Sequence, residues 1–251
     1  MKNIKKKKIN AAILIIGNEI LSGRTQDLNV VTISKWLNDL GVKLEEVRVI
    51  PDIEKMIIKT VNKIRKNFNY VFTTGGIGPT HDDITSKSIA KAFGLHYGYH
   101  KEAYKILEKY YKSSNFSDGR KKMAKIPDTA KLIYNPSSGA PGFIVENVFC
   151  LPGVPSILKS MVDGLNEKII GGKKILSQTI SVETVESEIA KSMEEVQKKL
   201  KNVEIGSYPF FRLGKIGVSI VSRSTSKKIL ENVNRDLIKI IKNKKIEILK
   251  V

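Results

Sequence analysis

Residues 71–86 read VFTTGGIGPTHDDITS, and this stretch decides the fold. A short apolar run enters a loop with three glycines and a proline, and two adjacent carboxylates, Asp82 and Asp83, follow. From Thr85 the sequence has the character of a helix start. A buried strand, a glycine-rich loop and a helix in this order are typical of one unit of a parallel α/β sheet. The two acidic side chains stand out in a chain whose formal net charge is +19.

The segments around this loop repeat the alternation of strands and helices. Continuous apolar runs such as residues 11–16 predict strands that are covered on both faces. We expect strands at 11–16, 42–50 and 70–74, helices at 28–40, 53–66, 85–93 and 101–112, a hairpin over 143–153 and a helix from Pro155 to Leu165. Gly41 and Gly94 are placed to end two of these helices. The alternation predicts an α/β fold with a mostly parallel, doubly covered sheet.

The pattern changes around the glycines at 171–172. The strands expected after this point are 175–182, 203–209 and 216–223, and the helices are 187–200 and 226–242. We therefore predict two domains, residues 1–172 and a smaller α+β domain over residues 173–251. Its alternation of helices over one face of an antiparallel sheet is similar to that of KH-like folds.

Composition limits the class of protein. No apolar run approaches the roughly 18–20 residues of a membrane span, so we expect no membrane partner. The apolar stretch near the N-terminus runs into a polar turn instead of a cleavage site, which indicates a cytoplasmic protein. The single cysteine, Cys150, is expected to be a small core residue.

The excess of basic residues raises the question of a nucleic-acid partner. The chain has 44 Lys and Arg against 25 Asp and Glu. The lysines are spread over almost every segment. The two basic clusters, at 5–8 and 120–125, could equally be a solvated arm and a solvated loop. A nucleic-acid-binding module stays open as an alternative function.

Polar segments follow several of the expected strands, where ligands of open parallel sheets bind. They are Gly17–Glu19, Pro51–Asp52, the glycine loop and Pro152–Gly153. In the glycine loop, Gly75, Gly76 and Gly78 allow close backbone approach, and exposed amides before a helix start can cradle phosphate. The spacing is neither the dinucleotide-binding GxGxxG nor a Walker A motif.

The carboxylates of this loop have two interpretations. One of Asp82 and Asp83 could cap the helix from Thr85, but both cannot fill one capping position. A carboxylate beside a phosphate cradle repels the ligand unless a cation intervenes, and Mg²⁺ is the ion that joins carboxylates to phosphate oxygens. Asp52 either caps the helix over 53–66 or reaches the same crevice.

Five motifs in order resemble the MoaB/Mog (MoCF) molybdopterin-binding domain family, and especially its competence/damage-inducible protein A (CinA) branch. They are IIGNEILSGRTQDLN (15–29), IPD (50–52), TTGGIGPTHDDIT (73–85), NPSSGAPGF (135–143) and LPGVP (151–155). The resemblance implies a three-layer α/β fold with a crevice for a pterin or nucleotide phosphate. It also implies a homo-oligomer, because related domains assemble as dimers or trimers.

The resemblance and the loops together give a set of candidate site residues. Asp52 and Asp83 fall on positions that matter for activity in the family, and Asp82 and Asp83 are the candidate ligands of a divalent metal, Mg²⁺ or Co²⁺. The candidate ligand-binding residues are Gly17, Glu19, Gly75, Gly76, Gly78, Pro79, Thr80, Asp82, Thr85, Ser138, Gly139, Pro152 and Gly153.

Relatives of the CinA branch, and the similar domain of FAD synthases, are linked to metal-dependent hydrolysis of ADP-ribose or FAD pyrophosphates. The segment IGSYPFF (205–211) resembles the linker domain of these proteins. The resemblance therefore implies a nucleotide pyrophosphatase, with molybdopterin binding or adenylylation as the alternative. Two features depart from the pattern: the deamidase domain of full-length CinA proteins is missing, and Asn18 replaces the Asp of many relatives.

Overall fold

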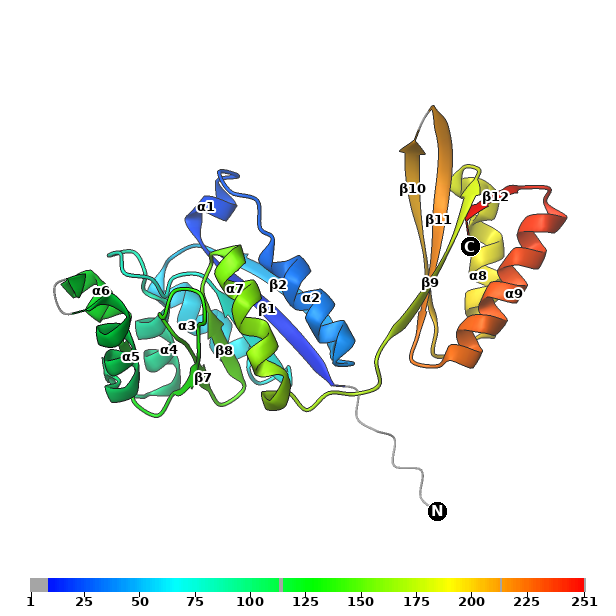
Figure 1. Ribbon diagram of the computed structural model, residues 1–251. Helices are drawn as coiled ribbons and strands as arrows, with labels where there is room; N and C mark the ends of the chain where they lie inside the picture. The colour runs from blue at the N-terminus through cyan, green and yellow to red at the C-terminus, as the bar shows by residue number, and fades with distance from the viewer. Residues whose placement is uncertain (1–8, 113–114, 213, 251) are drawn as a thin grey trace, which may run out of the picture. The chain divides into compact units, whose positions relative to one another are not determined.

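The computed structural model describes residues 9–112, 115–212 and 214–250. The basic cluster at residues 5–8 lies outside these ranges. The chain divides into two compact units, Met1–Gly172 and Lys173–Val251. Figure 1 shows the first unit in blue to green and the second in yellow to red.

The first unit is formed around one six-stranded sheet with the strand order β2-β1-β3-β8-β7-β6. Its strands are β1 (Asn10–Ile16), β2 (Lys43–Ile50), β3 (Tyr70–Thr74), β6 (Lys131–Ile133), β7 (Gly142–Val145) and β8 (Val148–Leu151). β2, β1, β3 and β8 pair in parallel, whereas β7 pairs antiparallel with both β8 and β6. The predicted mostly parallel sheet is confirmed.

Helices cover both faces of this sheet, as the continuous apolar strands required (Figure 1). They are α2 (Asn29–Asp39) and α7 (Pro155–Val162) on one face, and α3 (Glu54–Ile64), α4 (Thr85–Phe93) and α5 (Lys101–Tyr111) on the other. Successive residues of β1 alternate between the two cores: Ile13 packs with the α2–α7 layer and Leu14 with the α3–α4–α5 layer. This alternation explains why the strand is apolar at every position.

Several short elements were not expected from the sequence. They are α1 (Asn18–Leu21), α6 (Asp118–Lys122), the 3-10 helix η2 (Asp163–Lys168) and the two-stranded sheet of β4 (Tyr97–Tyr99) and β5 (Lys125–Pro127). The helix ends are as predicted at Gly41 and Gly94, which have φ of 71° and 67°. This left-handed conformation is the one in which glycine closes a helix.

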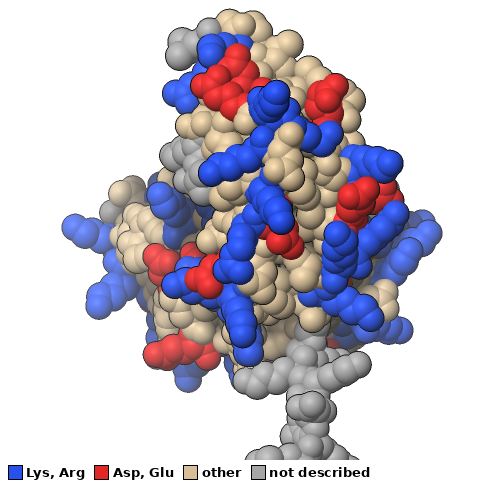
Figure 2. Space-filling view, turned by 90° about the vertical axis from the view of Figure 1, so that its right-hand side faces the viewer, with Lys and Arg blue, Asp and Glu red and all other residues tan. Residues whose placement is uncertain are grey.

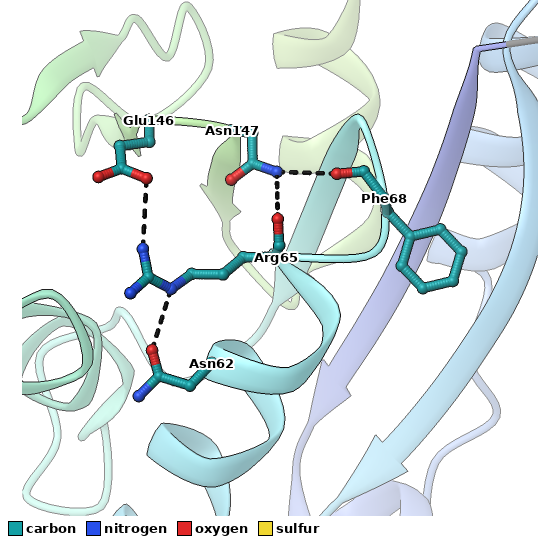
Figure 3. Close-up of polar contacts among 5 residues, drawn as sticks. All are labelled: Asn62, Arg65, Phe68, Glu146 and Asn147. Atoms are coloured by element: carbon teal, nitrogen blue, oxygen red, sulfur yellow. Dashed lines mark hydrogen bonds and ion pairs between the residues drawn. The ribbon is translucent and has the colours of Figure 1, made fainter.

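At the edge of the sheet where β3 and β8 begin, side chains form hydrogen bonds with the backbone carbonyls of the loops (Figure 3). Asn147, in the β7–β8 turn, donates hydrogen bonds of 2.9 Å to the carbonyl oxygens of both Arg65 and Phe68. The Arg65 guanidinium donates to Asn62 and forms an ion pair of 3.2 Å with Glu146. The end of α3 is thereby tied to the hairpin.

The second unit has one four-stranded antiparallel sheet in the order β10-β11-β9-β12. Its elements are β9 (Leu176–Glu183), α8 (Glu186–Lys199), β10 (Glu204–Arg212), β11 (Lys215–Ser224), α9 (Lys227–Asn243) and β12 (Glu247–Lys250). Both helices pack on one face through apolar residues such as Ile189 and Val233. The order is that of the ferredoxin-like split βαβ motif. The alternation that suggested a KH-like fold is also the alternation of this motif.

Two further observations bear on the expectations from composition. In the described ranges, no helix is both long and apolar enough to cross a membrane. The face of the molecule in Figure 2 carries lysine and arginine side chains scattered over its area with acidic side chains among them. The positive charge on this face is therefore dispersed.

Cys150 is fully buried in β8, and burial raises the pKa of its thiol to about 12. A thiol with so high a pKa is protonated and unreactive at neutral pH, as expected of a core residue.

Candidate functional site

The loops that carry the sequence motifs leave the sheet at one edge. β1, β2, β3 and β8 are parallel, so the segments after them begin at the same edge. β6 runs in the same direction as β8, because each is antiparallel to β7. The loop between β6 and β7 therefore also lies at this edge, which we call the carboxyl edge.

Three of these loops meet at Gly75, which follows β3. A Cβ atom on Gly75, whose φ is +97°, would lie only 2.2 Å from the backbone oxygen of Ile16 at the end of β1. A Cβ atom on Gly153, after β8, would lie 3.4 Å from the Cα of Gly75. The Gly75 amide donates to Leu151 O (3.1 Å), so this amide is occupied and the glycine serves close packing instead of phosphate contact. Asn29, at the start of α2, donates to Gly153 O (2.7 Å).

Gly76 packs directly on the first residue of α4. Its φ is +69°, and a Cβ atom there would lie 2.2 Å from the hydroxyl oxygen of Thr85. The Thr85 amide donates to Gly76 O (2.8 Å). The Thr85 hydroxyl is buried and has no hydrogen-bond partner within the described residues. The glycine loop is thus folded against the N-terminus of α4.

Asp83 holds the second half of the glycine loop. Its Oδ2 accepts hydrogen bonds from the amide (2.8 Å) and the hydroxyl of Thr80, and its own amide donates to Thr80 O (3.3 Å). A Cβ atom on Gly78 would lie 2.7 Å from the same carboxylate oxygen. The N-cap residue of α4 is Ile84, with no side-chain cap. The interpretation of Asp82 or Asp83 as a helix cap is therefore wrong.

Asp82 is exposed, whereas its neighbour Asp83 is half-buried. A hydrogen bond from the Thr80 side chain lowers the pKa of Asp82, and its own amide and the charges of His81 and Lys122 lower it further. The Thr80 hydroxyl has one proton, so it serves Asp82 or Asp83 at any moment. Asp83 shapes the loop, and Asp82 is the ionised carboxylate that the loop presents.

Asp52 reaches from the end of β2 to the loop after β1. Its Oδ2 accepts a hydrogen bond of 2.9 Å from the amide of Asn18. The N-cap residue of α3 is Ile53 and has no side-chain cap, so Asp52 does not fill the alternative capping role. The Glu19 carboxylate is folded against Gly17, where a Cβ atom would lie 2.5 Å from Glu19 Oε1. Two carboxylates thus border the loop after β1.

The loop between β6 and β7 is organised by the buried side chain of Asn135. Asn135 donates to the hydroxyl of Ser138 (2.7 Å) and accepts from its amide (3.0 Å). Gly139 lies under Tyr110 of α5, where a Cβ atom would come within 2.6 Å of the ring. Ser138 and Gly139 therefore lie on the α5 side of the carboxyl edge. A cavity of about 450 Å³ adjoins this loop and is lined by Ile106, Tyr134, Asn135, Pro136, Gly139, Ser160, Met161 and Gly164.

Pro79 and Pro152 have no polar side chain and contribute through the path of the backbone. Pro79 presents its carbonyl oxygen to α6, where a Cβ atom on Gly119 would lie 3.2 Å away. Pro152 is part of the segment that brings Gly153 to Gly75. These positions fit a role in loop shape.

Sequence reasoning did not select Lys122. Its ammonium donates a hydrogen bond to Thr80 O in the glycine loop. It lies in a segment that was read as a solvated basic loop or part of a nucleic-acid site, and no local signal separates it from the other lysines there. Asn29 and Asn18 were also missed, because one acts through a distant carbonyl and the other through its backbone amide.

The set of oxygen ligands at this edge limits the kind of metal that it could hold. No group of three His, Cys, Asp or Glu side chains able to hold a metal occurs among the described residues. Mg²⁺ is commonly bound through one or two carboxylates together with substrate phosphates and water. The exposed Asp82 and the second oxygen of Asp83 fit that mode of binding.

The family model described as a probable molybdopterin binding domain matches residues 12–171, and the chain belongs to this family. The first unit thus has a known fold class, and its carboxyl edge is where the motifs of the family lie. The model described as the middle domain of FAD synthase matches residues 174–250. The second unit is therefore like that domain and unlike a deamidase.

Relatives place the chain in the CinA-like branch. A protein from Archaeoglobus fulgidus is 34% identical over 197 residues, which are 78% of this chain and 84% of the relative. A protein from Pediococcus pentosaceus that has a competence-damage inducible name is 30% identical over 237 residues, or 90% of this chain. The chain spans 57% of the length of that longer relative.

The crystal structure of CinA from Thermoplasma acidophilum, whose function is described as unknown, resembles the chain with a TM-score of 0.60. The two are 31% identical, and the match covers 63% of this chain and 96% of that chain. The expected CinA-like fold is confirmed.

Proposed function

We propose that the carboxyl edge of the first unit binds the pyrophosphate group of a nucleotide such as ADP-ribose or FAD and hydrolyses it with a divalent cation. The observation that carries this proposal is the meeting of a glycine loop, an oriented carboxylate and an exposed ionised carboxylate at one edge of a parallel sheet. The sequence resemblance and the FAD synthase-like second unit point to the same class of substrate.

The glycine loop supplies donors for phosphate oxygens. Gly76 and Gly78 have backbone amides to which no hydrogen-bond acceptor is assigned in the described part of the chain. A side chain at Gly76 would collide with Thr85, so the backbone itself lines the surface. Such amides next to a helix start favour an anionic group.

A divalent cation suits the carboxylates of this loop. Asp82, with the second oxygen of Asp83, would hold the ion, and phosphate and water would complete its shell. A bound Mg²⁺ or Co²⁺ would neutralise charge on the pyrophosphate and polarise the phosphoryl oxygen. Without such neutralisation, Asp82 would repel the ligand that the glycine loop attracts.

Asp52 would orient the attacking water. One of its oxygens accepts from the Asn18 amide, which fixes the carboxylate and leaves the other oxygen for a water molecule. Little covalent chemistry is required of the protein in phosphoryl transfer, so positioning and charge neutralisation supply most of the rate.

The test is an assay of ADP-ribose and FAD hydrolysis with Mg²⁺ or Co²⁺. We expect metal-dependent turnover by the native protein, and a loss of about 100-fold or more in Asp82→Asn and in Asp52→Asn. Asp163→Asn is the matched control, because Asp163 is an exposed acid in η2 and its loss should leave turnover unchanged.

Asp83→Asn separates loop shape from metal binding. An amide oxygen at this position can still accept from the Thr80 amide, so the loop keeps its form while the charge is lost. If the native protein hydrolyses neither substrate with either cation, the proposed activity is wrong. If Asp82→Asn and Asp83→Asn both keep full turnover, the proposed metal site is wrong.

The description of the matching family favours a second candidate, binding or adenylylation of molybdopterin. The same glycine loop would then hold the pterin phosphate. Pterin fluorescence that remains with the purified protein, and is lost in Gly76→Val, would support this function over pyrophosphate hydrolysis.

A further inference from the structure

One basic side chain joins α6 to the glycine loop. The Lys122 ammonium donates to the backbone oxygen of Thr80, 42 residues earlier in the chain. Close to this contact, Gly119 packs on the carbonyl oxygen of Pro79. The one-turn helix α6 is therefore seated on the Pro79–Thr80 part of the loop, between the glycines and the two aspartates.

The neighbouring basic residues of α6 are held elsewhere. The guanidinium of Arg120 lies over the ring of Tyr111 at 4.3 Å from its centre. The ammonium of Lys121 forms an ion pair of 3.2 Å with Asp118 on the same helix. These contacts keep both charges on the side of α5 and α6. Among three consecutive basic residues, the contact with the glycine loop belongs to Lys122.

The positive charge of Lys122 acts on the carboxylate of Asp82 in the glycine loop. It is one of the charges that lower the pKa of Asp82, after the hydrogen bonds from Thr80 and from the aspartate's own amide. An ammonium group has three donors. In the described residues Thr80 O accepts one of them, so two are available to a ligand on the loop.

We propose that Lys122 binds a phosphate oxygen of the ligand at the glycine loop while it holds the loop through Thr80. This inference rests on the proposed function, which it deepens by naming the cationic residue that recognises the pyrophosphate. The positive charge of Lys122 partly offsets the negative charges of the two aspartates that follow Thr80. The loop can therefore accept an anion with several negative charges. A lysine is well suited to this role, because its compact charge can donate to the backbone and to phosphate at once.

The experiment uses inorganic pyrophosphate as the probe and measures its binding by calorimetry in the presence of Mg²⁺. We expect Lys122→Met to weaken binding by roughly 10- to 100-fold, as for the loss of a hydrogen bond to a charged group. Lys122→Arg keeps the charge and should bind within about threefold of the native protein. Lys121→Met is the matched control and should bind as the native protein does.

Salt dependence separates a charge contact from a purely structural role. Binding by the native protein should weaken as ionic strength rises, and this dependence should be smaller in Lys122→Met than in Lys121→Met. Fluorescence of Trp36, the single tryptophan, reports whether the first unit of each variant is folded.

The outcomes distinguish this inference from the proposed function. Equal affinity and equal salt dependence in Lys122→Met and the native protein would overturn the inference, even if ADP-ribose is hydrolysed. Absence of pyrophosphate binding to the native protein would overturn it as well. Pyrophosphate binding that depends on Lys122, without hydrolysis of ADP-ribose or FAD, would support the inference and contradict the proposed activity.

Discussion

The two edges of the first sheet carry loops of opposite character. At the edge where β3 and β8 begin, the side chain of Asn147 satisfies two backbone carbonyls and Arg65 is bound on both sides (Figure 3). At the carboxyl edge, the backbone amides of Gly76 and Gly78 have no assigned acceptor among the described residues, and Asp82 is exposed. Side-chain contacts tie the first edge together. The second has exposed donors and a carboxylate, which the proposed ligand would use.

Among the substitutions that test this difference between the edges, Gly75→Ala should have the largest effect on stability and binding. The new methyl would meet the backbone oxygen of Ile16, and alanine disfavours a φ of +97°. We expect the first unit to lose about 2–5 kcal/mol of stability, together with pyrophosphate binding. Urea unfolding followed by Trp36 fluorescence measures the loss, because this residue lies in the first unit.

Gly94→Ala is the matched control for this substitution. Gly94 also has a left-handed φ, but a Cβ atom there would meet nothing within 4 Å. The Gly94→Ala variant should lose about 1 kcal/mol of stability, with pyrophosphate binding unchanged. Equal losses in both variants would show that backbone conformation alone matters and that the close packing of Gly75 does not.

The sequence predicted the frame of the site because that frame depends on local patterns. Tyr70–Thr74 and Thr85–Phe93 have the bounds that their apolar periods and flanking glycine indicated. Of the two roles that the sequence left open for Asp52, the structure excludes the helix cap, because its partner, the Asn18 amide, belongs to another strand end. Hydrogen bonds between distant loops leave no periodic signal.

Lys122 escaped prediction for the same reason. Lys122 and Lys121 are adjacent, and no local sequence feature separates them. Only the path of the chain between α5 and α6 decides which of them reaches Thr80. The candidate residues Ser138 and Gly139 were selected from a motif, whereas the packing of Gly139 against Tyr110 required the fold.

A smaller effect is expected at the opposite edge from Asn147→Ala. The substitution removes two hydrogen bonds and leaves the carbonyls of Arg65 and Phe68 unpaired. We expect the first unit to lose about 1–3 kcal/mol of stability in urea unfolding, with pyrophosphate affinity unchanged. In the control Asn67→Ala, which removes an exposed bond to Lys63 O, the loss should be within about 0.5 kcal/mol. Loss of binding in Asn147→Ala would show that the edges are coupled.

At neutral pH the smallest effect concerns Cys150 in β8, whose contribution to stability changes only above pH 9. Its pKa is about 12 in the folded chain, against an ordinary value of 9.0. Above pH 9 the unfolded thiol loses its proton while the folded one keeps it. Stability from this group is therefore full below pH 9 and falls by about 1.4 kcal/mol per pH unit as pH rises toward 12. The difference in pH dependence between the native protein and Cys150→Ala measures it. Equal slopes would mean that the core around β8 admits water.

The insertion of β8 between β3 and β7 has a consequence for biosynthesis. β8 is made last of the six strands, yet it separates two that are made earlier, and Gly153 behind it joins Asn29 across 124 positions of chain. A nascent polypeptide that ends before this strand cannot assemble the carboxyl edge that we propose as the ligand site, whatever helices it has already formed. Affinity for pyrophosphate should therefore emerge in one step during translation, as the final strand is inserted.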